Sequence, residues 1–257
     1  MDFTITTYIL LLKTLQTREY SFQTFESFIT APLEKVIILR HDVDRLPSNA
    51  LKMARLEHKL GVAASYYFRA VPASWNEGII RKVSSLGHEV GYHYEDLSLA
   101  QGDPEKAIRH FEDQLERFRR ICPVKTICMH GSPLSRYDNR DLWTRYDYRD
   151  FGIIGEPYFD VDFKKVFYIT DTGRKWNNEA ASVRDWVESG FDIRIKNTAH
   201  LIELIEKGEL PEKVMINVHP QRWTDKWWPW AKELVGQNVK NAGKKVLIRI
   251  RSGYVVK

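Results

Sequence analysis

The sequence predicts an α/β fold in which parallel strands alternate with helices. Three observations support this prediction: six short β-rich apolar runs recur along the chain, stretches of helical periodicity separate them, and ionisable residues follow each run directly. Strands separated by helices of this length are joined in parallel by right-handed crossovers. The pattern fits either a (β/α) barrel or an open doubly wound sheet.

The chain is long enough for one large core. It has 257 residues, of which 43% are hydrophobic and 12% aromatic. An α/β barrel commonly forms a single domain of about 200–250 residues. We therefore expect one domain over residues 1–257. Residues 1–30, with helical periodicity in Tyr8 to Leu15 and around Phe22 to Phe28, are expected to form a helical extension packed on its outside.

The elements follow from composition and periodicity. The strands are expected at runs rich in β-branched and aromatic residues: Val36 to Leu39, Ala63 to Phe68, His88 to Tyr92, Thr126 to Met129, Val166 to Ile169 and Val214 to Val218. The helices are expected at amphipathic stretches: Ser48 to Leu60, Trp75 to Leu86, Asp103 to Ile121, Thr198 to Lys207 and about Asp225 to Asn241. Asp103, Pro104 and Glu105 supply an N-cap, a proline at the first helical position and an acid in the first turn.

Charge and termini exclude some classes of protein. The net charge of +5 comes from 39 basic residues scattered among 34 acidic ones, which does not favour nucleic-acid binding. An acidic Asp2 replaces the basic start of a signal peptide, and Lys13 interrupts the first apolar run, so we expect neither export nor membrane insertion. Cys122 and Cys128 lack a CxxC or zinc-finger context and are expected to be buried thiols in a reducing cytoplasm.

Ionisable residues gather where the strands end. In parallel α/β folds the chemistry lies at the carboxyl ends of the strands. The candidate residues at these positions are Asp42, Asp44, Arg69, His93, Glu95, His130, Asp171 and His219. Their types are those of a metal-assisted or acid/base site.

The segment RHDVD at 40–44 forms the end of the first predicted strand. Successive residues of an extended strand point to opposite faces. Arg40, Asp42 and Asp44 are therefore expected to point inward together, whereas His41 and Val43 point outward. The sequence predicts two carboxylates and a cation in one pocket.

Three motifs resemble those of a known family. VIILRHDVD at 36–44, GHEVGYH at 87–93 and VHP at 218–220 are similar to motifs of the polysaccharide deacetylase superfamily (NodB homology, carbohydrate esterase family 4), as a divergent HDVD-type member. The resemblance covers roughly residues 34–220. It implies a distorted (β/α)7-type barrel that hydrolyses N-acyl groups, such as acetyl, on carbohydrates with one divalent metal ion, expected to be zinc.

The resemblance also implies roles for individual residues. Asp42 would be the general base that activates water, with Arg40 or Arg69 lowering its pKa. Asp44 would be a metal ligand, and His219 would be the acid that protonates the departing amine.

One position departs from the family pattern. His93 matches the first metal histidine, but the second, four residues later, is replaced by Leu97, which cannot bind a metal. Either another residue completes the coordination or the site holds no metal. We favour His130, since CMHGSP places its imidazole before a Gly-Ser-Pro turn at the same rim, with Glu95 as the alternative.

The remaining candidates are expected to contact substrate: Arg40, Arg69, Glu95, Asp171 and Trp223. Trp223 belongs to the cluster RWTDKWWPW at 222–230, which follows His219 directly. Aromatic faces stack on sugars, although tryptophans at this spacing also pack helices onto barrels.

Two alternatives to a hydrolase remain open. Loss of the ligand at Leu97 would permit a non-catalytic sugar-binding module with the same barrel. A DxD motif also occurs in nucleotide-sugar glycosyltransferases, but there it normally follows a nucleotide-binding half of about 100 residues, whereas here it closes the first strand. We expect a carbohydrate substrate, such as an intermediate in making a surface polysaccharide.

Overall fold

The computed structural model describes residues 1–131, 135–176 and 187–253, with side chains as far as Asn241. Its centre is a seven-stranded sheet in the order β5-β4-β3-β2-β7-β6, with β1 also paired to β2. The strands are β1 (Ser21–Gln23), β2 (Val36–Val43), β3 (Ser65–Phe68), β4 (Glu89–Tyr94), β5 (Ile127–Met129), β6 (Phe167–Thr170) and β7 (Lys213–Val218). All six predicted strands are present.

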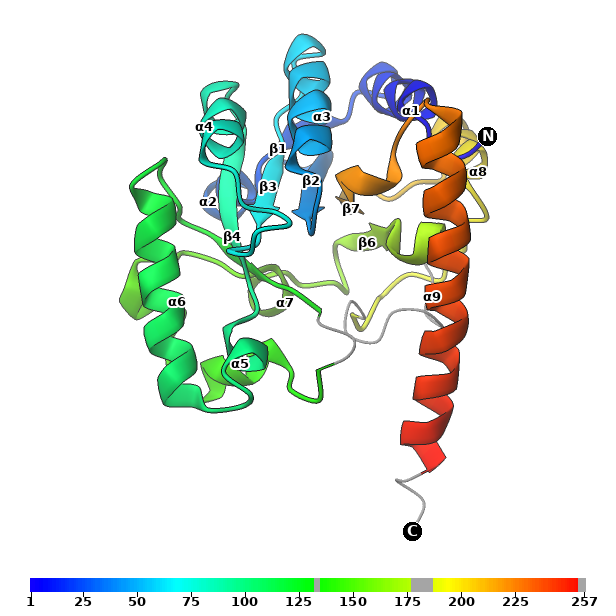
Figure 1. Cartoon of the computed structure of the whole chain (residues 1–257). Helices are drawn as coiled ribbons and strands as arrows, with labels where there is room; N and C mark the ends of the chain where they lie inside the picture. Colours follow the sequence, from blue (N-terminus) through cyan, green and yellow to red (C-terminus); the bar gives the residue numbers. More distant parts are fainter. Residues whose placement is uncertain (132–134, 177–186, 254–257) are drawn as a thin grey trace.

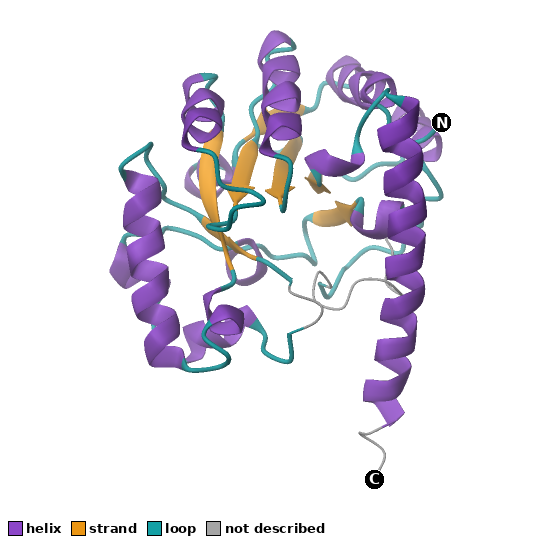
Figure 2. Cartoon of the chain, in the orientation of Figure 1, coloured by secondary structure: helices purple, strands orange, loops and turns teal. Residues whose placement is uncertain are grey.

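Every strand pair is parallel. Strand β2 is central: β7 pairs along residues 36–41 of one edge, while β1 and β3 share the other edge in succession. The sheet curls into a half-barrel with helices around its outer side (Figures 1 and 2). This architecture confirms the predicted α/β fold of the distorted-barrel type.

The helices cover the sheet. They are α1 (Ile5–Thr17), α2 (Phe25–Thr30), α3 (Pro47–Lys59), α4 (Glu77–Ser85), α5 (Asp96–Leu99), α6 (Pro104–Arg119), α7 (Pro157–Asp160), α8 (Thr198–Lys207) and α9 (Trp227–Gly253). Short 3₁₀ turns are η1 (Asn139–Thr144), η2 (Tyr148–Phe151), η3 (Thr172–Arg174) and η4 (Pro220–Arg222). The predicted N-cap is confirmed, because the Asp103 carboxylate accepts hydrogen bonds from the backbone amides of Glu105 and Lys106.

Two elements differ from the prediction. Residues 1–30 are not wholly helical, because β1 lies between α1 and α2 and joins the sheet beside β2. Helix α9 continues past Asn241 to Gly253. In addition, residues 132 and 133 of the predicted Gly-Ser-Pro turn lie outside the described residues. Among the helices described, none has both the length and the apolar character that would let it cross a membrane.

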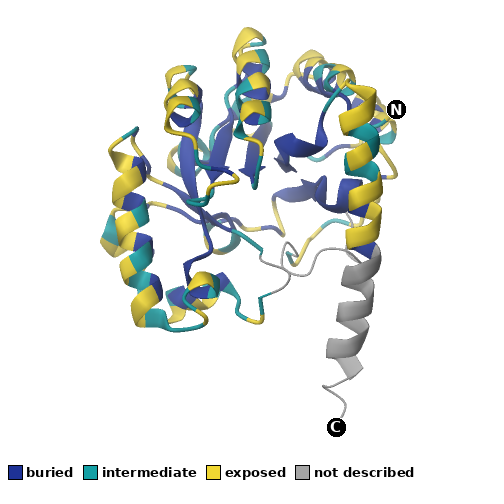
Figure 3. Cartoon of the chain, in the orientation of Figure 1, coloured by how far each residue is buried: buried dark blue, intermediate teal, exposed yellow. Residues whose placement is uncertain are grey.

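The alternation of the strands creates two cores. The outer core lies between the sheet and the surrounding helices, and it includes Ile37 and Leu39 of β2. The inner core fills the concave side and includes Ile38 of β2 with Tyr67 and Met215 from the flanking strands. The strands are buried throughout almost their whole length (Figure 3). Residues after Ile38 with the same parity therefore point to the concave side, as predicted for Arg40 and Asp42.

Candidate active site

The carboxyl ends of the strands bring the predicted polar residues into one connected cluster. Asp44, directly after β2, lies at its centre. The Nε2 atoms of three histidines face its carboxylate: His130 at 3.5 Å, His93 at 3.6 Å and His219 at 3.9 Å. Each histidine comes from a different strand end, so the parallel sheet assembles the cluster.

Asp44, His93 and His130 could hold a metal ion. One ligand atom from each lies within 4.8 Å of the other two. His93 is only 2% exposed, while the Asp44 side chain is 23% exposed and opens the group toward solvent. These are the three ligands predicted from the sequence.

Hydrogen bonds fix the orientation of both ligand imidazoles. Nδ1 of His93 donates to the backbone carbonyl of Cys128 at 2.9 Å, and Nδ1 of His130 donates to the Glu95 carboxylate at 3.0 Å. Each ring therefore directs the lone pair of its other nitrogen, Nε2, toward Asp44. Two imidazole nitrogens with one carboxylate form a donor set suited to zinc, and such outer hydrogen bonds are usual for metal-binding histidines.

Positive charge is favoured at this position. Burial would raise the pKa of Asp44, but a hydrogen bond with His93 and the charges of His219 and His130 lower it well below its usual range. Burial would lower the pKa of His93, but Asp42 and Asp44 raise it overall. The carboxylate is thus stabilised by positive charge, which a protonated imidazole or a divalent cation can supply.

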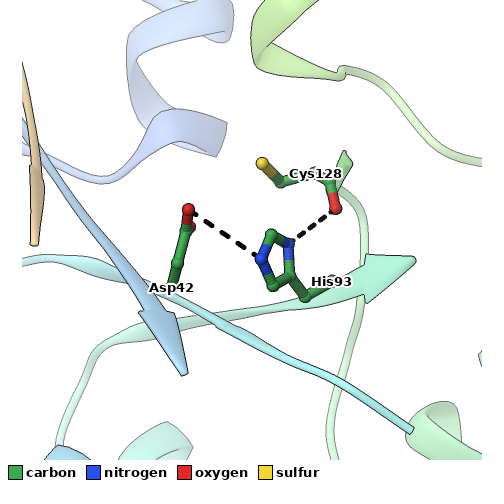
Figure 4. Close-up of side chains that lie close together, drawn as sticks. All are labelled: Asp42, His93 and Cys128. Carbon is green, nitrogen blue, oxygen red and sulfur yellow. Dashed lines mark hydrogen bonds and ion pairs between the residues drawn. The ribbon is translucent and has the colours of Figure 1, made fainter. Parts of the chain in front are cut away.

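A second group lies deeper in the half-barrel. Asp42, His93 and Cys128 also place one ligand atom each within 4.8 Å of the others (Figure 4). Asp42 is 1% exposed and Cys128 is fully buried, as the sequence predicted for this thiol. His93 belongs to both groups, and its Nε2 lies 3.9 Å from Oδ2 of Asp42. Protein donors already occupy the Asp42 carboxylate, so the outer group fits a metal better.

Arg40 holds Asp42 as an ion pair. Its Nε donates to Oδ1 at 2.9 Å and its Nη2 to Oδ2 at 2.7 Å, while Asn217 donates to Oδ2 at 2.9 Å. Burial would raise the pKa of Asp42, but the Arg40 guanidinium, followed by His93, lowers it far below its usual range. Arg40 rather than Arg69 therefore holds Asp42 as a carboxylate, and Arg40, whose side chain has no exposed surface, contacts Asp42 instead of a substrate.

Asp171, directly after β6, orients His219. Its Oδ1 accepts a hydrogen bond from His219 Nδ1 at 2.6 Å, and its Oδ2 accepts one from the His219 backbone amide at 3.0 Å. Burial would raise the pKa of Asp171, but Arg222 and His219 lower it. Asp171 contacts His219 and lies behind it, away from Asp44, so it orients this histidine rather than facing the cluster itself.

Trp223 has a different place from the one expected. Its ring is 1% exposed and packs against Phe3 and Tyr8, with centroids 5.1 and 5.2 Å away. Its Nε1 donates to Asp171 Oδ2 at 2.7 Å. The ring therefore has no open face for a sugar, and Trp223 supports Asp171 instead of contacting substrate.

Arg69 and Glu95 form a second ion pair at the rim. Arg69 donates from Nε to Oε1 and from Nη2 to Oε2, both at 2.8 Å. Burial would raise the pKa of Glu95, but His130 and Arg69 lower it to about 2. Both carboxylate oxygens have protein partners, so Glu95 is placed to support His130 rather than to bind a metal.

Three contributors were missed by the sequence analysis. Gln221 donates to Asp44 Oδ2 at 3.0 Å, and Arg222 donates to Asp171 Oδ1 at 2.7 Å. Asn217 pairs in register with Arg40 across β2 and β7, which places its amide beside Asp42. The parity of the last strand run could have indicated Asn217, because it shares the face of His219.

No protein-family model matches the chain, and the comparison with curated proteins also finds no match. Solved structures with a similar fold include a CE4 family pseudoenzyme from Bacillus anthracis, with 12% identity and a TM-score of 0.43 over 83% of this chain and 62% of that chain. A CE4 esterase from Streptococcus mutans matches with 12% identity and a TM-score of 0.45 over 93% of this chain and 91% of that one. PdaA of Bacillus subtilis, a family 4 carbohydrate esterase, matches with 12% identity and a TM-score of 0.46 over 90% of this chain and 84% of that one. This chain thus spans less than two thirds of the first of these proteins, and a functional interpretation rests on the side chains of the site.

Proposed function

We propose that the protein is a metal-dependent hydrolase of the polysaccharide deacetylase type, which removes an N-acyl group, such as acetyl, from a sugar or sugar intermediate. The observation that carries this proposal is the position of the Asp44–His93–His130 group. It lies between two separately held acid/base units, the Arg40–Asp42 pair and the Asp171–His219 pair. The motifs that resemble carbohydrate esterase family 4 supply the substrate class.

Asp44, His93 and His130 would hold the metal, which we propose to be zinc because of the mixed imidazole and carboxylate donors. A divalent ion bound there would lower the pKa of a bound water and polarise the acyl carbonyl.

Asp42 would accept the proton of the attacking water. Its ion pair with Arg40 keeps the carboxylate unprotonated and fixes its direction. The adjacent Nε2 of His93, 3.9 Å from Asp42 Oδ2, places this base beside the proposed metal ligands. A base positioned within reach of a reacting water contributes about 10²- to 10⁴-fold in rate.

His219 would supply the proton that an amine leaving group needs. Because Asp171 accepts the hydrogen bond from Nδ1, Nε2 faces the cluster and can carry the transferred proton. Asp42 and His219 thus act as base and acid on either side of Asp44. Amide hydrolysis requires both roles, since an unprotonated amine is a poor leaving group.

The glycosyltransferase alternative fits the geometry less well. A DxD motif that holds a metal against a diphosphate needs free carboxylate oxygens. Both oxygens of Asp42 accept hydrogen bonds from Arg40, and the carboxylate is 2% exposed. The first Asp of this motif is therefore held by Arg40 and does not act with Asp44 as a pair of metal ligands.

Acetate release tests the proposal. The full chain is incubated with N-acetylated monosaccharides and oligosaccharides, before and after removal of metal with a chelator and readdition of zinc. We expect chelation to stop acetate release, zinc to restore it, and Asp42→Asn to lack it even with zinc. Zinc bound at one ion per chain, with sugar binding but no acetate release, would instead support a non-catalytic sugar-binding module.

A further inference from the structure

The two imidazoles proposed as metal ligands are held by different kinds of acceptor. His93 lies within β4, and its Nδ1 donates to a backbone carbonyl whose position is fixed by the pairing of β4 with β5. His130 follows β5, is 15% exposed at its side chain, and donates to a side-chain carboxylate, that of Glu95. The orientation of His130 therefore depends on how firmly Glu95 is held.

Arg69 holds Glu95 in place. Its guanidinium donates two hydrogen bonds of 2.8 Å, one to each Glu95 oxygen, and the Glu95 side chain is 6% exposed. The remaining terminal nitrogen, Nη1, donates to the backbone carbonyl of Asp44 at 3.3 Å. Arg69 thus connects the segment that carries Asp44 to the carboxylate that orients His130.

The helical turn after β4 contributes no ligand. Leu97, four residues after His93, is 6% exposed and packs with Ala107 and Leu142 in a small apolar cluster. The polar contact to the metal group comes instead from Glu95, directly before α5. A leucine on this turn is compatible with a complete ligand set only if another element delivers an imidazole.

We propose that Arg69 and Glu95 are positioning residues, and that this ion pair orients His130 so that it can serve in place of a second ligand on the α5 turn. This inference rests on the proposed function, since it takes Asp44, His93 and His130 as the ligands. A carboxylate that accepts the Nδ1 hydrogen bond fixes the tautomer and ring orientation and makes the imidazole a better ligand. The bidentate geometry of Arg69 holds that carboxylate in one plane.

The proposal predicts graded losses of metal affinity. Loss of such an outer partner typically costs about 10- to 100-fold in affinity, so Glu95→Ala should weaken zinc binding by that factor. Glu95→Gln should weaken it less, because an amide oxygen can still accept from Nδ1 of His130. Arg69→Met should weaken it in the wild-type background but not in the Glu95→Ala background, because Arg69 acts through Glu95.

The experiment is a competition titration of zinc between the metal-free full chain and a chromophoric chelator. Cobalt absorption spectra of the same variants report the ligand geometry separately from affinity. Glu112→Ala, which removes an exposed carboxylate on α6, serves as the matched control and should behave like the wild type. Thermal unfolding without metal establishes that each variant is folded. The double variant Arg69→Met/Glu95→Ala removes both charges, so it carries the test if Glu95→Ala alone fails to fold.

The outcomes are distinct. A wild-type chain that binds zinc, with Glu95→Ala binding it equally well and giving an unchanged cobalt spectrum, would overturn the positioning role while leaving the proposed function intact. Additive losses for Arg69→Met and Glu95→Ala would show that Arg69 does not act through Glu95. A wild-type chain that binds no zinc would overturn the proposed function and this inference together.

Discussion

The two faces of β2 carry similar side chains but arrange them differently. On the outer face, His41 meets Glu57 of α3, and on the inner face Arg40 and Asp42 lead to Asp44 at the rim. Both faces thus combine buried carboxylates with imidazoles. The two faces differ in how closely protein groups surround the carboxylate.

On the outer face, protein donors close around the carboxylate. Glu57 Oε1 accepts from the Tyr8 hydroxyl at 2.6 Å and contacts His41 Nε2 at 2.8 Å, while Oε2 accepts from the Tyr66 hydroxyl at 2.7 Å. Glu57 and His41 have no exposed surface, and the His41 and Tyr66 rings stack with centroids 4.2 Å apart. This network is buried and ties α1 and α3 to the sheet.

On the inner face, three imidazoles face one carboxylate at longer distances. The Nε2 atoms of His130, His93 and His219 lie 3.5 to 3.9 Å from Asp44, and Gln221 donates to one Asp44 oxygen at 3.0 Å. Each imidazole is anchored from behind through Nδ1. This anchoring from behind turns Nε2 of all three imidazoles toward the Asp44 carboxylate.

The largest expected effect is on metal binding. Asp44→Ala should abolish it, because only two neutral imidazoles of the proposed ligand set would remain. Asp42→Asn and Glu57→Gln should both retain one ion per chain, which metal analysis after gel filtration would measure. Equal loss of metal in Asp44→Ala and Asp42→Asn would refute the division of roles between the two aspartates.

His219→Ala should lower turnover of an N-acetylated sugar by about two to four orders of magnitude, with bound metal and thermal stability nearly unchanged. The reason is that the departing amine would lack its proton. An ester with a good leaving group should be much less affected. If both substrates are lost alike, His219 serves the metal or the fold, and the acid lies elsewhere.

Glu57→Gln should act on stability instead. Removing the charge from this closed network should cost about 3 kcal/mol in the free energy of unfolding. Burial would raise the pKa of Glu57, but the charge of His41 and the hydrogen bonds that the Glu57 carboxylate accepts lower this pKa overall. The ionised form therefore stabilises the fold above the unfolded pKa of about 4.3, and this stabilisation is lost as the pH falls through the lower folded value. Urea unfolding at pH 7 and pH 3 should show a gap between wild type and variant that narrows in acid; a gap of equal size at both pH values would contradict the ionised network.

The smallest effect is expected for Trp223→Phe, which keeps an aromatic ring in the core but removes the hydrogen bond to Asp171. One hydrogen bond contributes about 1 kcal/mol to stability. If this bond helps Asp171 to orient His219, the same energy corresponds to about a fivefold decrease in turnover. Affinity for the sugar should stay the same, since the ring is buried. A rise in KM with unchanged kcat would show that Trp223 contacts the substrate after all.

The residues at the strand ends could be predicted from the sequence because their placement depends on strand alternation and parallel pairing. Alternation along RHDVD placed Arg40 and Asp42 on one face, and the parallel arrangement brings the carboxyl ends of β4, β5 and β7 to the same rim. The grouping of Asp44 with His93 and His130 follows from those two rules. No knowledge of the intervening helices was needed.

What the sequence could not supply depends on contacts between distant segments. Strand β1 has only three residues, too few for a periodic signal, and it exists through pairing with β2. Trp223 was assigned to the substrate because its burial depends on Phe3 and Tyr8, more than 200 residues earlier. Likewise, Leu97 indicates that a ligand is missing from α5, but only the fold shows Glu95 beside His130.

The most direct test is a crystal of the full chain soaked with zinc, with anomalous scattering recorded at the zinc absorption edge. We predict one peak bound by the Asp44 carboxylate and by Nε2 of His93 and His130, with Arg40 still paired to Asp42. A peak at Asp42, His93 and Cys128, or no peak in a crystal that contains zinc, would contradict the assignment of the metal to the open, inner-face rim of β2.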